Sequence, residues 1–351
     1  SWVPVCADIA RDKILAVQGP QIREYNNDFS DPGGSVSIIY SFNTEHPEIE
    51  NPVIDMVGVL SNGSIIASLR PGTTQPASVW VSNPEKTVFT KTHEAHALGV
   101  RYDRAWGHDS HGNIVVLSEY GSLGVATKAY LSVDYGVTWR EIFDLSEHVS
   151  APSGAHIHSI CYDPWWSRIW VSTGDTSTCR GIWYSDNWGD TWVRVTNQYQ
   201  PTSIIAMENC ILFGADGLPG GIWRINRERK NKVLTTEDIQ IAYIPEAHPE
   251  TLNNLRLLAT TFNRKDYNSP VYTSWQFQFS PPAGTPSTDS GLIIATKDGY
   301  NFYEVFKDWN KYPVGYGVVN AFETSDNYLV GVLTSPDHTG YRFLHPAPTW
   351  E

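Results

Sequence analysis

Two histidines, His156 and His158, stand out as residues whose type and spacing could do chemistry. They lie two residues apart in a short alternating run, so both rings point to the same side if the run is a strand. Histidine titrates near neutrality and can act as a general base or bind a sugar hydroxyl. A pair of hydrogen-bonded structural histidines would leave the same pattern, and both interpretations stay open at this point.

Further polar residues are expected beside this pair. Tyr120, in Glu119-Tyr120-Gly121, could exchange a proton, although an ordinary half-buried tyrosine fits the pattern equally well. Arginines could grip a carboxylate with two hydrogen bonds or simply form surface ion pairs. The other candidates for this site are Arg70, His93, His96, Arg104, Asp175, Arg180 and Arg264.

The elements that must position these residues are short strands. Apolar residues alternate or run briefly, as in 114–117 and 169–172, with Gly, Asn, Asp and Pro between the runs. Almost no stretch has helical periodicity. The pattern therefore predicts an all-β fold.

A repeated octapeptide indicates which all-β fold this is. Ser132-Val133-Asp134-Tyr135-Gly136-Val137-Thr138-Trp139 is matched by Ser185-Asp186-Asn187-Trp188-Gly189-Asp190-Thr191-Trp192, and the two serines are 53 positions apart. A shortened copy covers 296–302 and an eroded copy covers 82–89. These are Asp boxes, in which polar side chains bond the backbone of a tight turn and Gly supplies a positive φ. Asp boxes are typical of sialidase-like β-propeller blades.

A repeat of about 50 residues predicts seven blades in one domain, residues 1–351. The expected blades cover residues 10–45, 52–92, 100–144, 154–197, 201–240, 252–306 and 316–351. In the fourth blade we expect strands at His156–Tyr162, Arg168–Gly174, Gly181–Ser185 and Trp192–Thr196.

The antiparallel strands of a blade place all Asp boxes on one face, so the opposite face is expected to bind the ligand. Counting back five residues from Asp163 and from Asp109 places His158 and Arg104 on that ligand face. The turn on the Asp-box face holds Trp165 and Trp166, which we interpret as packing or surface residues.

Charge limits the classes of partner. The chain has 25 basic and 38 acidic residues, a formal net charge of −13, which disfavours nucleic acid and anionic membranes. No apolar stretch approaches the roughly 20 residues of a membrane helix. The first residue is Ser1 and no leader precedes Val5, so we expect a mature, secreted, extracellular monomer.

The four cysteines, Cys6, Cys161, Cys179 and Cys210, are widely spaced and include no CxxC pair. One or two disulfides are expected, with four free buried thiols as the alternative. The histidines show no convincing zinc spacing, so we expect no metal at the site and no required cofactor. A structural calcium ion in the channel remains compatible with the fold.

Two stretches resemble a known family. The run from His156 to Pro164, continuing through Ile169–Asp175 to an Asp box, is similar to seven-bladed Asp-box polysaccharide lyases. So is the stretch from Trp106 to Gly121. The resemblance covers roughly 101–224 and is strongest to the fungal L-rhamnose-α-1,4-D-glucuronate lyases that act on gum arabic, with ulvan lyases more distant.

That resemblance implies β-elimination at a glucuronate residue of an acidic plant or algal polysaccharide, with exo-acting release of terminal L-rhamnose. This chemistry needs an arginine on the carboxylate, a neutral base for the C5 proton and an acid for the O4 leaving group. Our hypothesis makes His158 the base, supported by His156, and Tyr120 the acid or a shared base and acid. Arg104 or Arg180 would hold the carboxylate, and the other candidates would bind substrate.

Two other functions remain open. A sialidase-like glycoside hydrolase is one, because Ser68-Leu69-Arg70-Pro71 partly echoes the Arg-Ile-Pro motif of sialidases. A hydrolase needs two carboxyl groups across the bond, however, and the predicted site is richer in histidine. A propeller that binds carbohydrate without catalysis is the other, because this fold hosts many functions.

Overall fold

The computed structural model describes residues 3–8, 13–26, 36–72, 74–103, 106–150, 152–215, 221–227, 232–243, 255–264, 267, 271–279, 289–308, 317–323, 328–334 and 340–346. Its helices are single turns: α1 (Phe42–Glu45), α2 (Leu145–His148), and the 3₁₀ turns η2 (Pro152–Gly154) and η3 (Thr236–Asp238). No helix within these ranges is long and apolar enough to cross a membrane.

Six four-stranded sheets follow one another along the chain. The first two are β1 (Val3–Asp8), β2 (Lys13–Gln18), β3 (Gln21–Asn26), β4 (Val36–Ser41) and β5 (Val53–Val59), β6 (Ile65–Arg70), β7 (Ser78–Ser82), β8 (Phe89–Glu94). The next two are β10 (His108–His111), β11 (Ile114–Ser118), β13 (Lys128–Ser132), β14 (Arg140–Asp144) and β15 (His156–Asp163), β16 (Arg168–Gly174), β17 (Gly181–Ser185), β18 (Val193–Thr196). The last two are β19 (Pro201–Ala206), β20 (Cys210–Ala215), β21 (Ile222–Asn226), β22 (Ile239–Tyr243) and β23 (Leu255–Arg264), β24 (Val271–Phe279), β25 (Asp289–Thr296), β26 (Tyr303–Asp308).

A three-stranded sheet ends the described chain, with β27 (Gly317–Glu323), β28 (Tyr328–Thr334) and β29 (Gly340–Pro346). A separate two-stranded ribbon pairs β9 (Val100–Arg101) with β12 (Tyr120–Gly121). Within each sheet the strands are antiparallel and pair in chain order.

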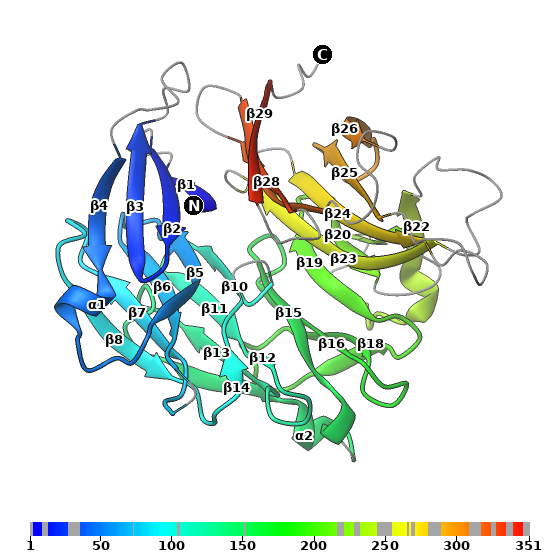
Figure 1. Cartoon of the computed structure of the whole chain (residues 1–351). Helices are drawn as coiled ribbons and strands as arrows, with labels where there is room; N and C mark the ends of the chain where they lie inside the picture. The colour runs from blue at the N-terminus through cyan, green and yellow to red at the C-terminus, as the bar shows by residue number, and fades with distance from the viewer. Residues whose placement is uncertain are drawn as a thin grey trace, which may run out of the picture.

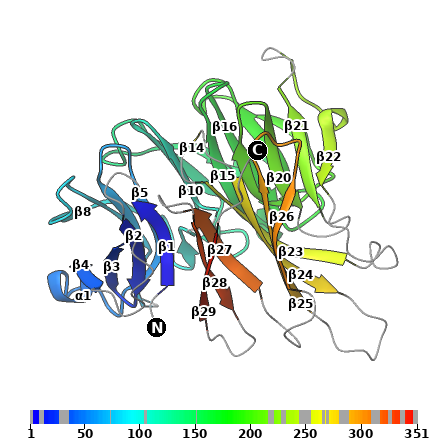
Figure 2. The same cartoon turned by 90° about the horizontal axis from the view of Figure 1, so that it is seen from above.

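The sheets are the blades of an all-β propeller (Figures 1 and 2). The first strands of successive sheets lie side by side, since β10, β15, β19, β23 and β27 contact one another in that order. At the ends of the chain, β1 lies beside β27 and β28 (Figure 2). The first strands therefore surround the central channel, as expected for a propeller.

The predicted count of seven blades needs correction. Six complete four-stranded blades are present, and the stretch predicted as the seventh contributes only the three strands β27–β29 among the described residues. The repeat length predicts how many units follow one another along the chain, but it does not predict how many strands each unit contributes. Strands of the fourth blade match the prediction to within one residue at each end.

The Asp boxes form the predicted turns between third and fourth strands. In the β13–β14 turn, Ser132 Oγ accepts from Gly136 N at 2.8 Å, and Asp134 Oδ1 accepts from Thr138 N at 2.9 Å. The second copy repeats this scheme with Asn187 in place of the aspartate. Gly136 needs its positive φ of 78°, which glycine adopts at no steric cost. Trp139 and Trp192 pack against the neighbouring blades.

The hydrophobic core lies between adjacent blades. One cluster joins the fourth and fifth blades around Trp170 and Phe213, and another joins the third and fourth around Val116 and Ile169. Because each blade buries its faces against both neighbours, the ring positions the channel-facing strand ends rigidly.

The expected disulfides are absent from the structure, which describes all four cysteines. Cys161 lies in the cluster between the fourth and fifth blades, Cys179 in the cluster between the third and fourth, and Cys210 beside Met207 and Leu212. These clusters are separated by whole sheets, so the thiols lack the close approach that a disulfide requires.

Candidate active site

The site is built at the start of the channel-facing strand β15. His156 begins this strand and is 8% exposed, and His158 is 4% exposed. The β15–β16 pairing shifts register between Ile157 and Ser159, so His158 sits in a β-bulge, a device that re-aims a side chain. The two imidazole centroids are 4.9 Å apart, so the rings share one side, as predicted.

Each ring is anchored through Nδ1. His156 Nδ1 lies 2.8 Å from the carbonyl oxygen of Gly121, and His158 Nδ1 lies 2.9 Å from that of Pro201. A carbonyl oxygen only accepts, so each Nδ1 carries the proton and donates it. This fixes the tautomer, and Nε2 of each ring is then the atom that gains or loses a proton.

Asp175 joins the two Nε2 atoms. It follows the end of β16, and its Oδ2 lies 3.4 Å from His156 Nε2 while its Oδ1 lies 3.3 Å from His158 Nε2. Gln200 donates to the same Oδ1 at 2.9 Å. The Asp175 side chain is 35% exposed, so this end of the site meets solvent. The side chains of His156 and His158 are 10% and 5% exposed, so the carboxylate is the part of the trio that meets solvent.

This arrangement favours one shared proton. With both rings neutral, two Nε2 lone pairs would face carboxylate oxygens, whereas one protonated ring forms a charge-assisted pair with Asp175. Protonating the second ring as well would place two cations side by side. The geometry can therefore accommodate one imidazolium and one neutral imidazole next to each other.

The pKa shifts indicate which ring is neutral. Burial is the main cause that lowers the pKa of His156, and the neighbouring His158 and Arg101 charges lower it further. The pKa of Asp175 is lowered, chiefly by its hydrogen bond with His158. His156 therefore favours the neutral form, and Asp175 favours the ionised form.

Tyr120 and Arg101 form the next wall of the site. The Tyr120 ring lies 4.6 Å from the His156 ring, and the Arg101 guanidinium lies over Tyr120 at 4.9 Å from its centroid. The β9–β12 ribbon pairs these two residues directly. Arg101 Nε is buried without a hydrogen-bond partner, and Arg101 Nη2 lies 3.9 Å from Asp103 Oδ2.

Two predicted histidines lie elsewhere. His93 packs between the rings of Tyr130 and Tyr102, at 4.2 and 5.8 Å, and burial lowers its pKa to about 4. His96 is half-exposed, and its Nδ1 lies 2.7 Å from the fully buried Glu119, whose pKa is raised by burial. His93 is thus a core residue, and His96 belongs to a separate pair with Glu119.

Within the described part of the chain, no contact joins a predicted arginine to His156 or His158. Arg70 forms a two-point ion pair with Asp55, at 2.9 and 3.2 Å. Arg180 is bound through Nε to the carbonyl oxygen of Asn197 at 3.0 Å. Arg104 lies outside the described residues, and Arg264 ends β23 with a side chain that the structure does not describe.

The same trio could hold a metal ion, which the sequence spacing did not indicate. The Nε2 atoms of His156 and His158 and a carboxylate oxygen of Asp175 lie within 4.8 Å of one another. Two imidazoles and one carboxylate suit zinc or a similar cation, and metal-binding histidines usually donate their other nitrogen to a carbonyl. The third ligand comes from another strand, so no local motif could reveal the set.

Arg101 and Gln200 are the residues that sequence reasoning missed. Arg101 lies on a two-residue strand, which is too short to show an alternating pattern in the sequence. Its pairing with Tyr120 is visible only in the structure. Gln200 lies just before β19 and meets Asp175 only because the fourth and fifth blades pack together. Both positions depend on contacts between segments distant in sequence.

Comparison with known proteins shows the fold. No protein-family model and no curated protein matches the chain. Among solved structures, YCF48 from Cyanidioschyzon merolae is similar with a TM-score of 0.56 and 13% identity, over 99% of each chain. The GH74 xyloglucanase from Xanthomonas campestris has a TM-score of 0.56 and 12% identity, over 99% of this chain and 56% of its own. A puromycin-hydrolyzing peptidase from Mycobacterium tuberculosis has a TM-score of 0.56 and 10% identity, over 99% of this chain and 52% of its own.

These similar proteins have different activities on one architecture. This chain spans about half the length of the xyloglucanase and of the peptidase. At such low identities the similarity establishes a β-propeller and leaves the activity to the site residues.

Proposed function

We propose that this protein is a polysaccharide lyase that cleaves the bond at O4 of a glucuronate residue by β-elimination. The observation that carries the proposal is the shared carboxylate of Asp175, whose Oδ2 lies 3.4 Å from His156 Nε2 and whose Oδ1 lies 3.3 Å from His158 Nε2. β-Elimination needs one base and one acid at neighbouring atoms of the substrate, and this pair supplies both.

The reaction moves one proton onto the protein and another off it. The base takes the C5 proton, the C4–C5 double bond forms, and the C4–O4 bond breaks with its electrons on O4. The acid then protonates O4, which leaves with the released sugar. C5 and O4 are separated by C4 alone, so a base and an acid whose atoms lie within 4.8 Å can serve both.

We assign His156 as the base and His158 as the acid. The lowered pKa of His156 keeps its Nε2 lone pair available, while His158 Nε2 lies 3.3 Å from the Asp175 carboxylate, which can stabilise a proton on that ring. After one turnover the proton has moved from His158 to His156, and the shared carboxylate gives it a route back. This assignment differs from the hypothesis drawn from the sequence, in which His158 is the base, His156 supports it and Tyr120 is the acid or a shared base and acid.

The substrate carboxylate must be neutralised for the C5 proton to become acidic. Arg101 fits this role because its Nε lacks a partner and its guanidinium lies over Tyr120, beside His156. Tyr120 holds the guanidinium by a cation–π contact and places its ring against the base. Arg104 remains a second candidate for the carboxylate.

The substrate class is supported by the resemblance of residues 101–224 to lyases that release terminal L-rhamnose from gum arabic. We therefore propose exo-acting release of rhamnose from rhamnosyl-glucuronate side chains by a secreted, monomeric enzyme. A sialidase-like hydrolase is less well supported, because it would need a second carboxyl group and Glu119 is fully buried beneath His96.

Incubation of the purified protein with gum arabic, and separately with ulvan, tests the proposal. A lyase raises ultraviolet absorbance as unsaturated uronate forms, and free rhamnose appears with it. Sugar release without the absorbance would indicate a hydrolase. No reaction on either polysaccharide would favour a carbohydrate-binding propeller without catalysis.

A further inference from the structure

A second pocket lies on the opposite face of the propeller. Its volume is about 560 Å³, and it is lined by Trp165, Trp166, Glu208, Asn209, Asn226, Arg227 and Tyr300. These residues come from the β15–β16 turn, the β19–β20 turn, the end of β21 and the Asp box after β25. The site of His156 lies at the other end of β15, so the two sites are separate.

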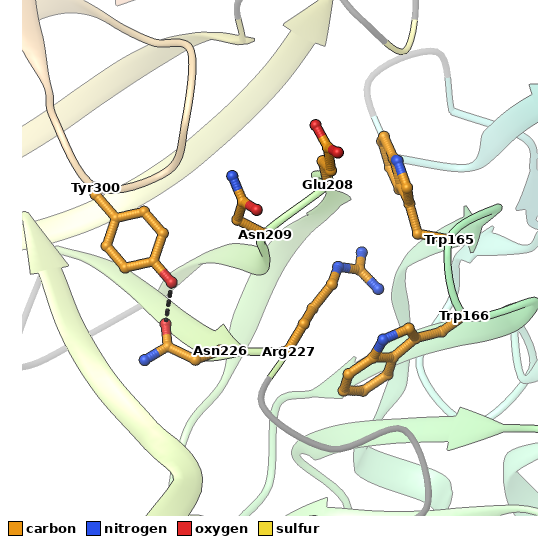
Figure 3. Close-up of a pocket in the computed structure, with 7 residues that line it drawn as sticks. All are labelled: Trp165, Trp166, Glu208, Asn209, Asn226, Arg227 and Tyr300. Carbon is orange, nitrogen blue, oxygen red and sulfur yellow. Dashed lines mark hydrogen bonds between the residues drawn. The ribbon is translucent and has the colours of Figure 1, made fainter.

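The walls of this pocket are aromatic and its other lining groups are polar. Figure 3 shows Trp165 and Trp166 on one side, Tyr300 on the other, and the amide and carboxylate groups between them. Tyr300 is 44% exposed, and its hydroxyl donates to Asn226 Oδ1 at 3.2 Å. The volume falls in the usual range of small-molecule sites.

Arg227 gives the pocket a buried donor that lacks a partner. Its side chain is 7% exposed, its Nε donates to the Met207 carbonyl oxygen at 2.7 Å, and its Nη1 is bonded to the fully buried Asp163. Its Nη2 is buried without a hydrogen-bond partner, although Arg227 lines the pocket. A buried donor of this kind is costly unless something accepts from it, which points to a ligand oxygen.

The charges select the ligand class. Asp163 already balances the Arg227 charge, and the exposed Glu208 adds an acceptor with a negative charge, so a simple anion is disfavoured. A neutral sugar offers hydroxyls that both donate and accept, and its C–H face matches the negative face of an aromatic ring.

We propose that this pocket is a second, non-catalytic site that binds one neutral sugar unit of a polysaccharide. The Arg227 guanidinium lies over the rings of Trp165 and Trp166, 5.3 and 5.1 Å from their centroids. In the proposed complex Arg227 Nη2 donates to a sugar oxygen, Glu208 and Asn209 bond hydroxyls, and the exposed ring of Tyr300 packs against the sugar. The sequence led us to interpret Trp165 and Trp166 as packing or surface residues, and in the structure both also line this pocket, Trp166 as a core residue and Trp165 as a half-buried one.

Affinity electrophoresis of the full chain tests this proposal. The gels contain neutral polysaccharides (arabinogalactan, xyloglucan or galactomannan), and gum arabic serves as the charged comparison. At least one neutral gel should retard the protein. Tyr300→Ala and Glu208→Ala should each weaken the retardation, together on the order of tenfold in affinity, while Tyr300→Phe should keep most of it.

Three controls separate the possible outcomes. Tyr303→Ala removes a 51% exposed tyrosine that does not line the pocket and should bind as the original chain does. The His156→Ala/His158→Ala variant should retain the retardation, because it alters the other face. Arg227→Lys keeps a charge near Asp163 but removes the Nη2 donor, and should weaken binding with a folded far-ultraviolet spectrum.

The proposal is overturned if no neutral gel retards the protein or if the pocket variants bind like the original chain. Retardation confined to gum arabic and abolished by salt would overturn it as well, since that would indicate an anion site.

Discussion

His156 and His158 direct their Nε2 atoms to the two oxygens of one carboxylate, at 3.4 and 3.3 Å. Both Nδ1 atoms are already committed to backbone carbonyls, so proton exchange is confined to this shared edge. An acid and a base are thereby kept side by side without a second carboxyl group. The following predictions depend on this relationship.

Removal of the His156 or the His158 imidazole should slow turnover strongly. We expect His156→Ala and His158→Ala each to lower kcat by about 10²–10⁴-fold, the usual contribution of general acid–base catalysis. His111→Ala is the matched control, because His111 stacks on Tyr267 and Tyr162 at the Asp-box face. Activity within a factor of two in either active-site variant, measured by uronate absorbance, would exclude that ring from proton transfer.

The pH profile should reflect the lowered pKa of His156. A base with a lowered pKa stays neutral into acid, so the acidic limb of kcat/KM should lie below the ordinary histidine value near 6.5. Asp175→Asn removes a negative charge that raises the pKa of His156, so this pKa should fall further and the acidic limb should move to lower pH. An unmoved acidic limb would separate Asp175 from the base.

Arg101 should act on the substrate carboxylate. Arg101→Gln is expected to lower kcat/KM by at least about 10²-fold, since the enolate-like intermediate loses its positive partner. Arg101→Lys keeps the charge but not the planar fork, so partial activity is expected. Arg140→Gln, which alters an exposed arginine paired with Asp190, provides the control and should leave kinetics unchanged.

Zinc should inhibit the proposed lyase activity. The trio could bind the ion through the same Nε2 atoms that the reaction uses, so added Zn²⁺ should reduce the rate and a chelator should restore it. The chelator alone should not reduce activity. Loss of activity on chelation, with recovery on adding metal, would instead make the trio a catalytic metal centre.

One prediction concerns stability. The Lys86–Asp8 ion pair joins the first blade to the turn of the second, with side chains only 5% and 1% exposed. Asp8→Asn should lower the free energy of unfolding by about 3–5 kcal/mol, because it leaves a buried charge unpaired. Asp190→Asn, at the exposed pair with Arg140, should cost less than about 1 kcal/mol. Urea unfolding measures both, and equal losses would contradict the reasoning.

The propeller could be predicted from the sequence because the blades repeat the same short patterns, namely Asp-box turns and alternating apolar residues. The Asp-box residues specify their own turns, and the alternation around Arg168–Gly174 specifies its strand. The pairing of His156 and His158 is local too, which is why the sequence indicated it. Asp175 and Tyr120 were also expected nearby, since strand ends on one face converge around the channel.

Contacts between distant segments were beyond such reasoning. Arg70 was expected at the site but pairs with Asp55 across its own hairpin, and His93 is drawn into the core by Tyr130 and Tyr102. Arg101 reaches the site through a two-residue ribbon that periodicity cannot reveal. The final, three-stranded blade β27–β29 likewise has no Asp box in its sequence.

Mass spectrometry of the products from a defined rhamnosyl-glucuronate oligosaccharide tests the central claim most directly. β-Elimination adds no water, so the masses of the two products should sum to that of the substrate, and the uronate product should carry the double bond. Neither product should gain label when the reaction is run in ¹⁸O water. Products that sum to the substrate plus one water, with ¹⁸O in one of them, would show hydrolysis and contradict the account.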